Sequence, residues 1–96
     1  MICYKDNKFS LNWIDVSGIT DMTSMFSDYT TEKKMNFMGD ISEWDVSNVN
    51  NFINMFYGAS SFNQDLSSWK IRKTANTERM FYQCPIRRYY KPLALQ

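Results

Sequence analysis

Three acidic side chains stand close enough together to suggest a carboxylate pair for acid–base chemistry. Asp40, Glu43 and Asp45 lie near one another, and Glu43 and Asp45 alternate with Trp44 along an extended segment. The sequence contains no histidine, which excludes Ser-His-Asp and Cys-His nucleophile pairs and every histidine metal site. Ordinary surface chemistry favours a solvated face on which Asp40 and Asp65 cap turns. We therefore predict that the protein is not an enzyme.

The cysteines and glycines provide no alternative site. Cys3 and Cys84 are too few for a disulfide framework or a four-thiolate zinc site, and the sequence leaves open whether they pair with each other. Cys84 aligns with Ala59 in the repeat described below, which predicts a buried structural thiol. The three glycines are isolated, so no phosphate-binding loop is expected. We expect no cofactor and no metal.

Basic residues interleaved with aromatic residues make the strongest binding signal in the chain. The candidate binding residues all lie near the C-terminal end: Lys70, Arg72, Lys73, Arg79, Arg87, Arg88, Tyr89, Tyr90 and Lys91. This pattern suits a nucleic-acid backbone or an acidic protein partner. The plainer interpretation is a charged end cap that keeps the last repeat soluble.

The net charge of +1 conceals a division along the chain. Residues 1–69 carry nine acidic side chains against four lysines, a net charge of −5. Residues 70–96 carry seven basic side chains against Glu78 alone, a net charge of +6. Such asymmetry between two parts of a chain indicates polarity in binding.

An internal repeat organises these residues. The segment that starts at Asp40 recurs from Asp65, and an earlier copy starts at Ser10. The first copy departs by its tryptophan, Trp13, which stands one place early, and by five extra residues in the polar stretch 29–36, which we expect to be a loop insertion. The aligned apolar positions are Leu11, Ile41 and Leu66; Ile14, Trp44 and Trp69; Val16, Val46 and Ile71; Met25, Met55 and Met80; and Phe26, Phe56 and Phe81. Their recurrence in one register predicts stacked core ladders.

Two periodicities follow one another within each copy. Ile41, Trp44 and Val46 suit a short extended segment, and the next apolar residues recur every three or four positions, as on one helix face. We expect asparagines to cap this helix and Gly58 to end it. The expected helix face and its caps are Val49, Phe52, Met55, Phe56 and Ala59, with Asn48, Asn50 and Asn51.

A single unit of about 25 residues cannot bury both its strand and its helix face alone, so the copies must stack. The predicted fold class is therefore α/β, a short leucine-rich-repeat-like parallel solenoid of about three strand–turn–helix units, each of about 25 residues. The chain is expected to form one domain. Its predicted parts are a lead-in (1–9), a first unit with the insertion (10–36), a second unit (37–61), a third unit (62–86) and a basic C-terminal end (87–96).

The repeat resembles a known family. The run GDISEWDVSNVNNFINMFYGASSFNQDLSSW is similar to the BspA-like leucine-rich repeats of mycoplasma surface lipoproteins and of many viral and phage proteins. The resemblance extends over roughly residues 10 to 92, and the ending MFYQCPIRRYYKP resembles the closing unit of that family. It implies a surface or interaction role and assigns no catalytic residue, since a fold-level likeness leaves function open.

Two functions remain open from the sequence. The first is a non-enzymatic protein–protein interaction module with a protein partner. The alternative is a small viral or mobile-element inhibitor that engages nucleic acid, or a host complex that handles it, through the basic C-terminal end. Head-to-tail self-association of the basic end with the acidic end of another copy is a further expectation. With no apolar signal segment and no span of about 18 apolar residues, we expect no membrane insertion and a cytoplasmic location, or a surface or secreted one for a piece of a longer protein.

Overall fold

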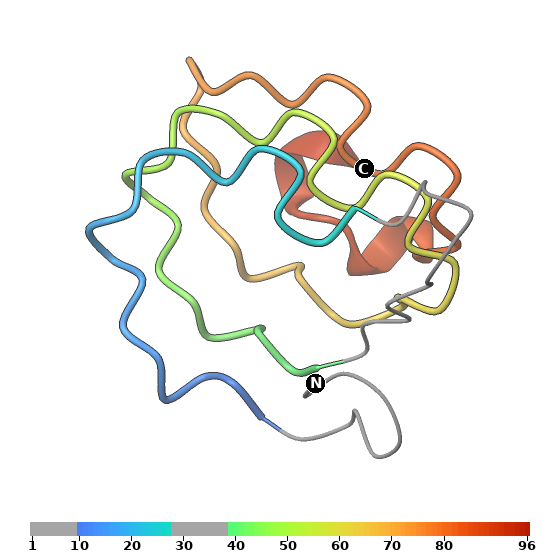
Figure 1. The fold of residues 1–96 in the computed structure, drawn as a ribbon, viewed down its shortest axis with the longest axis horizontal. Helices are drawn as coiled ribbons and strands as arrows, with labels where there is room; N and C mark the ends of the chain where they lie inside the picture. Colours follow the sequence, from blue (N-terminus) through green and yellow to red (C-terminus); the bar gives the residue numbers. More distant parts are fainter. Residues whose placement is uncertain (1–9, 28–38) are drawn as a thin grey trace.

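The computed structural model describes residues 10–27 and 39–96. Three similarly bent segments lie side by side in it (Figure 1). They are the sequence copies, here named the first copy (10–27), the middle copy (39–61) and the last copy (62–86). The lead-in 1–9 with Cys3, the predicted insertion 29–36 and the boundary between the first two units lie outside the described residues. The C-terminal segment (87–96) contains the only helices of the described residues, the 3₁₀ helices η1 (Arg88–Tyr90) and η2 (Leu93–Leu95).

The predicted fold class, an α/β solenoid of strand–turn–helix units, is wrong. Within residues 10–27 and 39–96 the structure contains no α-helix and no β-strand. Pairing between copies that qualifies as β-structure is limited there to three isolated parallel bridges, Ser10↔Asp40, Asp21↔Asn51 and Asn51↔Asn76. The copies are built instead from consecutive tight turns.

The expected helix at residues 49–59 is a series of turns because its backbone bonds have the wrong span. The N–H groups of Met55, Tyr57 and Ala59 each donate to the carbonyl three residues earlier, at 3.0–3.1 Å. An α-helix needs donation to the fourth residue back. Turns of this length also place an apolar residue every three or four positions, so the periodicity was real and its structural interpretation was wrong.

Left-handed residues prevent these turns from continuing into a helix. Asn54 has φ 57° and Gly58 has φ 73°, and each stands third in a four-residue turn. Type II turns require a positive φ at this place, which favours Gly or Asn. The equivalent residues in the other copies, Ser24, Arg79 and Gln83, are also left-handed, so the repeat extends to backbone conformation.

Hydrogen bonds between copies run mainly in one direction. In the middle copy, backbone N–H groups of alternate residues donate to carbonyls of the last copy, as in Asn54 to Glu78 (3.1 Å) and Phe56 to Met80 (2.8 Å). The first copy donates to the middle copy in the same register, for example Phe26 to Met55 at 2.8 Å. Each copy therefore lies with its donor edge against the acceptor edge of the next.

The core consists of ladders that cross the three copies, as the repeat predicted, except that Met25 of the predicted methionine ladder is 37% exposed. Phe26, Phe56 and Phe81 stack with ring centroids 5.6 and 5.4 Å apart. The indole N–H groups of Trp44 and Trp69 each donate at 3.0 Å to the preceding copy, onto the carbonyls of Leu11 and Ile41 respectively. Trp13 departs from its ladder and is 79% exposed.

Candidate functional site

Two of the three carboxylates that resembled an acid–base pair, those of Asp40 and Asp45, are engaged in local turns. Oδ1 of Asp45 accepts from the backbone N–H and the hydroxyl of Ser47, at 3.0 and 2.6 Å, and Asp65 holds Ser67 in the same way. The Ser47 hydroxyl, and then its N–H, lower the pKa of Asp45. Asp40 accepts from the N–H of Ser42, which confirms turn capping by Asp40 and Asp65. A carboxylate with a lowered pKa is a poor proton carrier near neutral pH.

Cys84 is a half-buried thiol, less buried than its alignment with the fully buried Ala59 predicted. Its Sγ donates to the carbonyl of Phe62 at 3.6 Å, and burial raises the pKa of the thiol. The protonated form is therefore favoured, and a thiol is a weak nucleophile. No group of three or more His, Cys, Asp or Glu in the described part of the chain could hold a metal ion.

The predicted basic residues lie on the last copy and on the C-terminal segment. Lys70, Arg72, Lys73 and Arg79 belong to the last copy and are exposed. Arg72 donates through Nη1 to Oδ1 of Asn50 at 3.0 Å. Lys70, Lys73 and Arg79 have no side-chain hydrogen bond or ion pair within residues 10–27 and 39–96. The surface charge of this copy is thus almost entirely unpaired.

The rest of the predicted site lies at η1. Arg87, Arg88 and Tyr89 are exposed, whereas Tyr90 and Lys91 are half-buried. Arg87 Nη1 lies 3.4 Å from the Tyr89 hydroxyl, and the rings of Tyr89 and Tyr90 meet edge to face at 5.2 Å. Tyr90 also packs against the core, so Tyr89 is the more accessible of the two aromatic rings.

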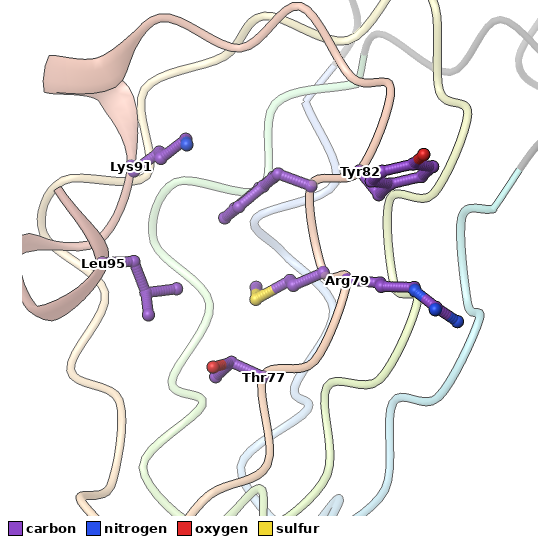
Figure 2. A pocket seen from close by; sticks show the side chains of 7 residues that line it. Thr77, Arg79, Tyr82, Lys91 and Leu95 are labelled. Atoms are coloured by element: carbon purple, nitrogen blue, oxygen red, sulfur yellow. The ribbon is translucent and has the colours of Figure 1, made fainter.

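An open groove brings two of the predicted bases together. It has a volume of about 410 Å³ and is named here the end groove; its lining is Thr77, Arg79, Met80, Phe81, Tyr82, Lys91 and Leu95. Leu95 and Lys91 border it from the C-terminal segment, while Arg79 and Tyr82 point to the far side of the last copy (Figure 2). Lys91 Nζ lies 5.7 Å from the centroid of the Phe81 ring, a cation–π distance.

A second, smaller cavity of about 300 Å³ gathers Lys70 with Trp69, Ile71, Leu93 and Ala94. The remaining predicted bases line neither of these two cavities. The sequence pattern missed five groove residues: Thr77, Met80, Phe81, Tyr82 and Leu95. Phe81 and Tyr82 were visible in the repeat, but their exposure depends on the last copy having an uncovered side. The signal that could have found them is their place in the final copy.

The fold defines a repeat protein made of stacked turns with a basic surface at one end. Residues 3–90 match the family described as Mycoplasma protein of unknown function, DUF285. This match covers most of the chain, so the protein belongs to that family. No curated protein and no solved structure matches the chain significantly. Among the described residues no helix is long and apolar enough to cross a membrane.

Proposed function

We propose that the protein is a non-enzymatic interaction module that binds an acidic protein partner through the basic surface of its last copy and C-terminal segment. The observation that carries the proposal is the unpaired charge of this surface. Seven basic side chains face a single acid, Glu78, in residues 70–96, and within the described ranges none of the seven forms an ion pair. Complementary charge speeds encounter and selects partners.

Local chemistry supports a binding role over a catalytic one. The aspartates of the copies are held in turns, such as Asp15 with Ser17 and Asp45 with Ser47, and Cys84 is a half-buried thiol with a raised pKa. The resemblance to BspA-like repeats, whose members are regarded as surface or interaction proteins, supports the same role. This resemblance names a repeat type and is more specific than the match to the DUF285 family, whose function is unknown.

Affinity capture with charge variants tests the proposal. The chain is immobilised and exposed to a nuclease-treated lysate of the source cells. We expect an acidic protein to be retained by the natural chain and by Lys70→Arg/Lys73→Arg, and to be lost with Lys70→Glu/Lys73→Glu. Both variants change exposed side chains without partners, so the fold is preserved. Equal retention by the two variants, or none by the natural chain, contradicts the proposal.

Nucleic-acid binding is a second candidate because one observation favours it. Tyr89 is 62% exposed and lies beside Arg87 and Arg88, an arrangement that can stack a base beside phosphate contacts. Gel-shift titration with single-stranded DNA and RNA oligonucleotides tests it at low salt, where such binding is strongest. Binding that weakens in Tyr89→Ala supports this candidate, and the absence of a shift at low salt removes it.

A further inference from the structure

The last copy ends in a row of unpaired backbone donors. In the middle copy the N–H groups that donate to the last copy, at 2.7–3.1 Å, are those of Phe52, Asn54, Phe56 and Gly58. Their equivalents in the repeat register of the last copy are Thr77, Arg79, Phe81 and Gln83. Across residues 10–27 and 39–96, none of these four N–H groups has an acceptor. An open row of unpaired backbone donors is a place where a further segment of chain can pair, as the last copy does on the middle copy.

The last copy presents one side with these four N–H groups, and the C-terminal segment covers only the other half of that side. The N–H of Leu66 donates to the carbonyl of Tyr90 at 2.7 Å. The bond from Phe52 to Asn76 joins residues equally far apart in the chain, so η1 stands where the beginning of a fourth copy would stand. The segment then turns into η2, and the row 77–83 stays uncovered. The end groove is the space left beside this row.

The walls of the end groove combine apolar surface with positive charge. Phe81 and Leu95 are half-buried and form apolar walls. Lys91 supplies the positive charge beside the groove, whereas the Arg79 side chain points away from it, to the far side of the last copy (Figure 2). Glu78 is the nearest acid along the chain, and its own N–H is held by Oδ1 of Asn76 at 3.0 Å. A segment with carboxylates and apolar side chains matches these walls.

We infer that the end groove binds an acidic segment of the partner protein, which adopts turns like those of residues 76–82 and pairs its carbonyls with the N–H groups of Thr77, Arg79, Phe81 and Gln83. This inference rests on the proposed function and names the site and the chemistry of the bound segment. Because the bridges between copies are parallel, the segment runs parallel to residues 77–83. The acceptors of the equivalent row in the middle copy lie within residues 76–82, so a segment of seven residues in the same turns supplies all four carbonyls.

A folded second copy of this chain fits the site less well. The first copy of another chain does offer exposed acceptor residues, Asp21 and Thr23, whose carbonyls make no hydrogen bond within the described ranges. Its residues 10–19 would belong to the same layer, however, and would require the place that the C-terminal segment already holds. Self-association through this side is therefore an outcome that the test must distinguish.

Amide hydrogen exchange with a defined peptide tests the inference. The probe is an acetylated and amidated heptapeptide of alternating glutamate and valine, and its matched control has lysine in place of glutamate. In the unliganded protein we expect the four N–H groups of Thr77, Arg79, Phe81 and Gln83 to exchange quickly. The glutamate peptide should slow their exchange at least tenfold when the site is saturated, while the lysine peptide should leave it unchanged.

Two variants with the same charge change separate groove binding from general attraction. Lys91→Glu should weaken peptide binding about tenfold through the loss of a charge-assisted contact in the groove. Arg88→Glu, on exposed η1 away from the groove lining, should weaken it less than about threefold because its charge is screened by salt. Equal weakening without protection of the four amides would show diffuse attraction and would overturn the inference.

The remaining outcomes each decide the question. Absence of protection of the four amides at about 1 mM peptide overturns the inference that the end groove binds an acidic segment. If partner capture still depends on Lys70 and Lys73, the proposed function is kept and only the groove is rejected as its site. If the four amides become protected without peptide as the protein concentration rises, a second copy of the chain binds to them. Protection by single-stranded RNA, and none by the glutamate peptide, assigns the row to nucleic acid. Both results overturn the peptide assignment.

Discussion

The middle and last copies share a pattern of apolar residues and differ in what surrounds it. Phe56 is fully buried, with the Phe26 ring on one side and the Phe81 ring on the other. Phe81 occupies the equivalent place but is only half-buried, and its other neighbour is the ammonium group of Lys91. The place of a copy in the stack, more than its residue types, decides whether an aromatic ring is core or surface.

The polar turns of the two copies show the same division. In the middle copy, Asp45 stabilises a turn by accepting from Ser47. In the last copy the equivalent pair is Lys70 and Arg72, and Arg72 reaches back to Asn50. The turn of the last copy lies one residue later, since Ala75 donates to the carbonyl of Arg72 at 3.1 Å, whereas Val49 donates to the carbonyl of Val46 in the middle copy. Because Lys70 stands where the middle copy has Asp45, the last copy adds positive charge to the surface that we propose binds a partner.

The largest expected contrast is between the two stacked phenylalanines. Phe56→Ala should lower the free energy of unfolding by about 3–5 kcal/mol, because it removes a ring packed on both faces. Phe81→Ala should cost about 1–2 kcal/mol, since its ring is only half-buried and stacks on a single neighbouring ring. Urea unfolding followed by tryptophan fluorescence measures both values. Equal losses would refute the contrast between an enclosed and an open copy.

The left-handed positions provide the second contrast. Gly58→Ala should destabilise the middle copy by about 1–2 kcal/mol, because φ is 73° there and a Cβ is disfavoured. Gln83→Gly, at the equivalent position of the last copy with φ 57°, should stabilise the protein by about 0.5 kcal/mol. Thermal and urea unfolding of the two variants provide the test. A destabilising Gln83→Gly would mean that the glutamine side chain contributes more than its backbone strain costs.

A smaller contrast compares two aligned side chains at the surface. Asn48 Nδ2 donates to the carbonyl of Ser17 at 2.8 Å, whereas Lys73 has no partner within the described ranges. Asn48→Ala should cost about 0.5–1 kcal/mol, and Lys73→Ala should leave the free energy of unfolding unchanged within about 0.5 kcal/mol. In the capture experiment the order should reverse, with Lys73→Ala showing the greater loss of partner.

Lowering the pH should destabilise the turns that the aspartates cap, as the direction of their pKa shifts indicates. Hydrogen bonds from Ser17 and Ser47 lower the pKa of Asp15 and Asp45 below the ordinary 3.8. The stability they contribute is present above pH 3.8 and is lost as the pH falls through the lowered folded-state pKa. Asp15→Asn/Asp45→Asn should weaken this acid dependence and keep the turns, because Asn51 caps Ile53 in the same way. Unfolding curves from acid to neutral pH measure the slope, and an unchanged slope would assign it to other carboxylates.

The repeated apolar pattern predicted the copies, their register and their core ladders, because apolar residues recur at one offset where stacked layers contact one another. Phe26, Phe56 and Phe81 align by register alone and do stack. It failed on the local structure. Spacings of three and four residues, as from Phe52 to Met55 and Phe56, fit a helix and a chain of turns equally well. The left-handed Asn54, which the pattern did not reveal, decides between them.

For the candidate site, the sequence located the charge and missed the groove. Arg79 and Lys91 were both predicted, but only the return of the C-terminal segment brings them to one cavity. The unpaired N–H groups could not be predicted either, since backbone donors have no sequence signature. Their availability depends on which half of the last copy η1 covers, through the bond from Leu66 to Tyr90.

By itself, the sequence determined that this protein is a repeat with an acidic body, a basic end and no histidine. These properties reside in residue types and spacings, which any conformation of the chain would retain. Only the tertiary structure decided that the repeat folds as turns, and that the last copy keeps one half of its side open. The physical reason is that a hydrogen bond between copies depends on the direction of the backbone and on the neighbouring segment, and the type of a single residue determines neither.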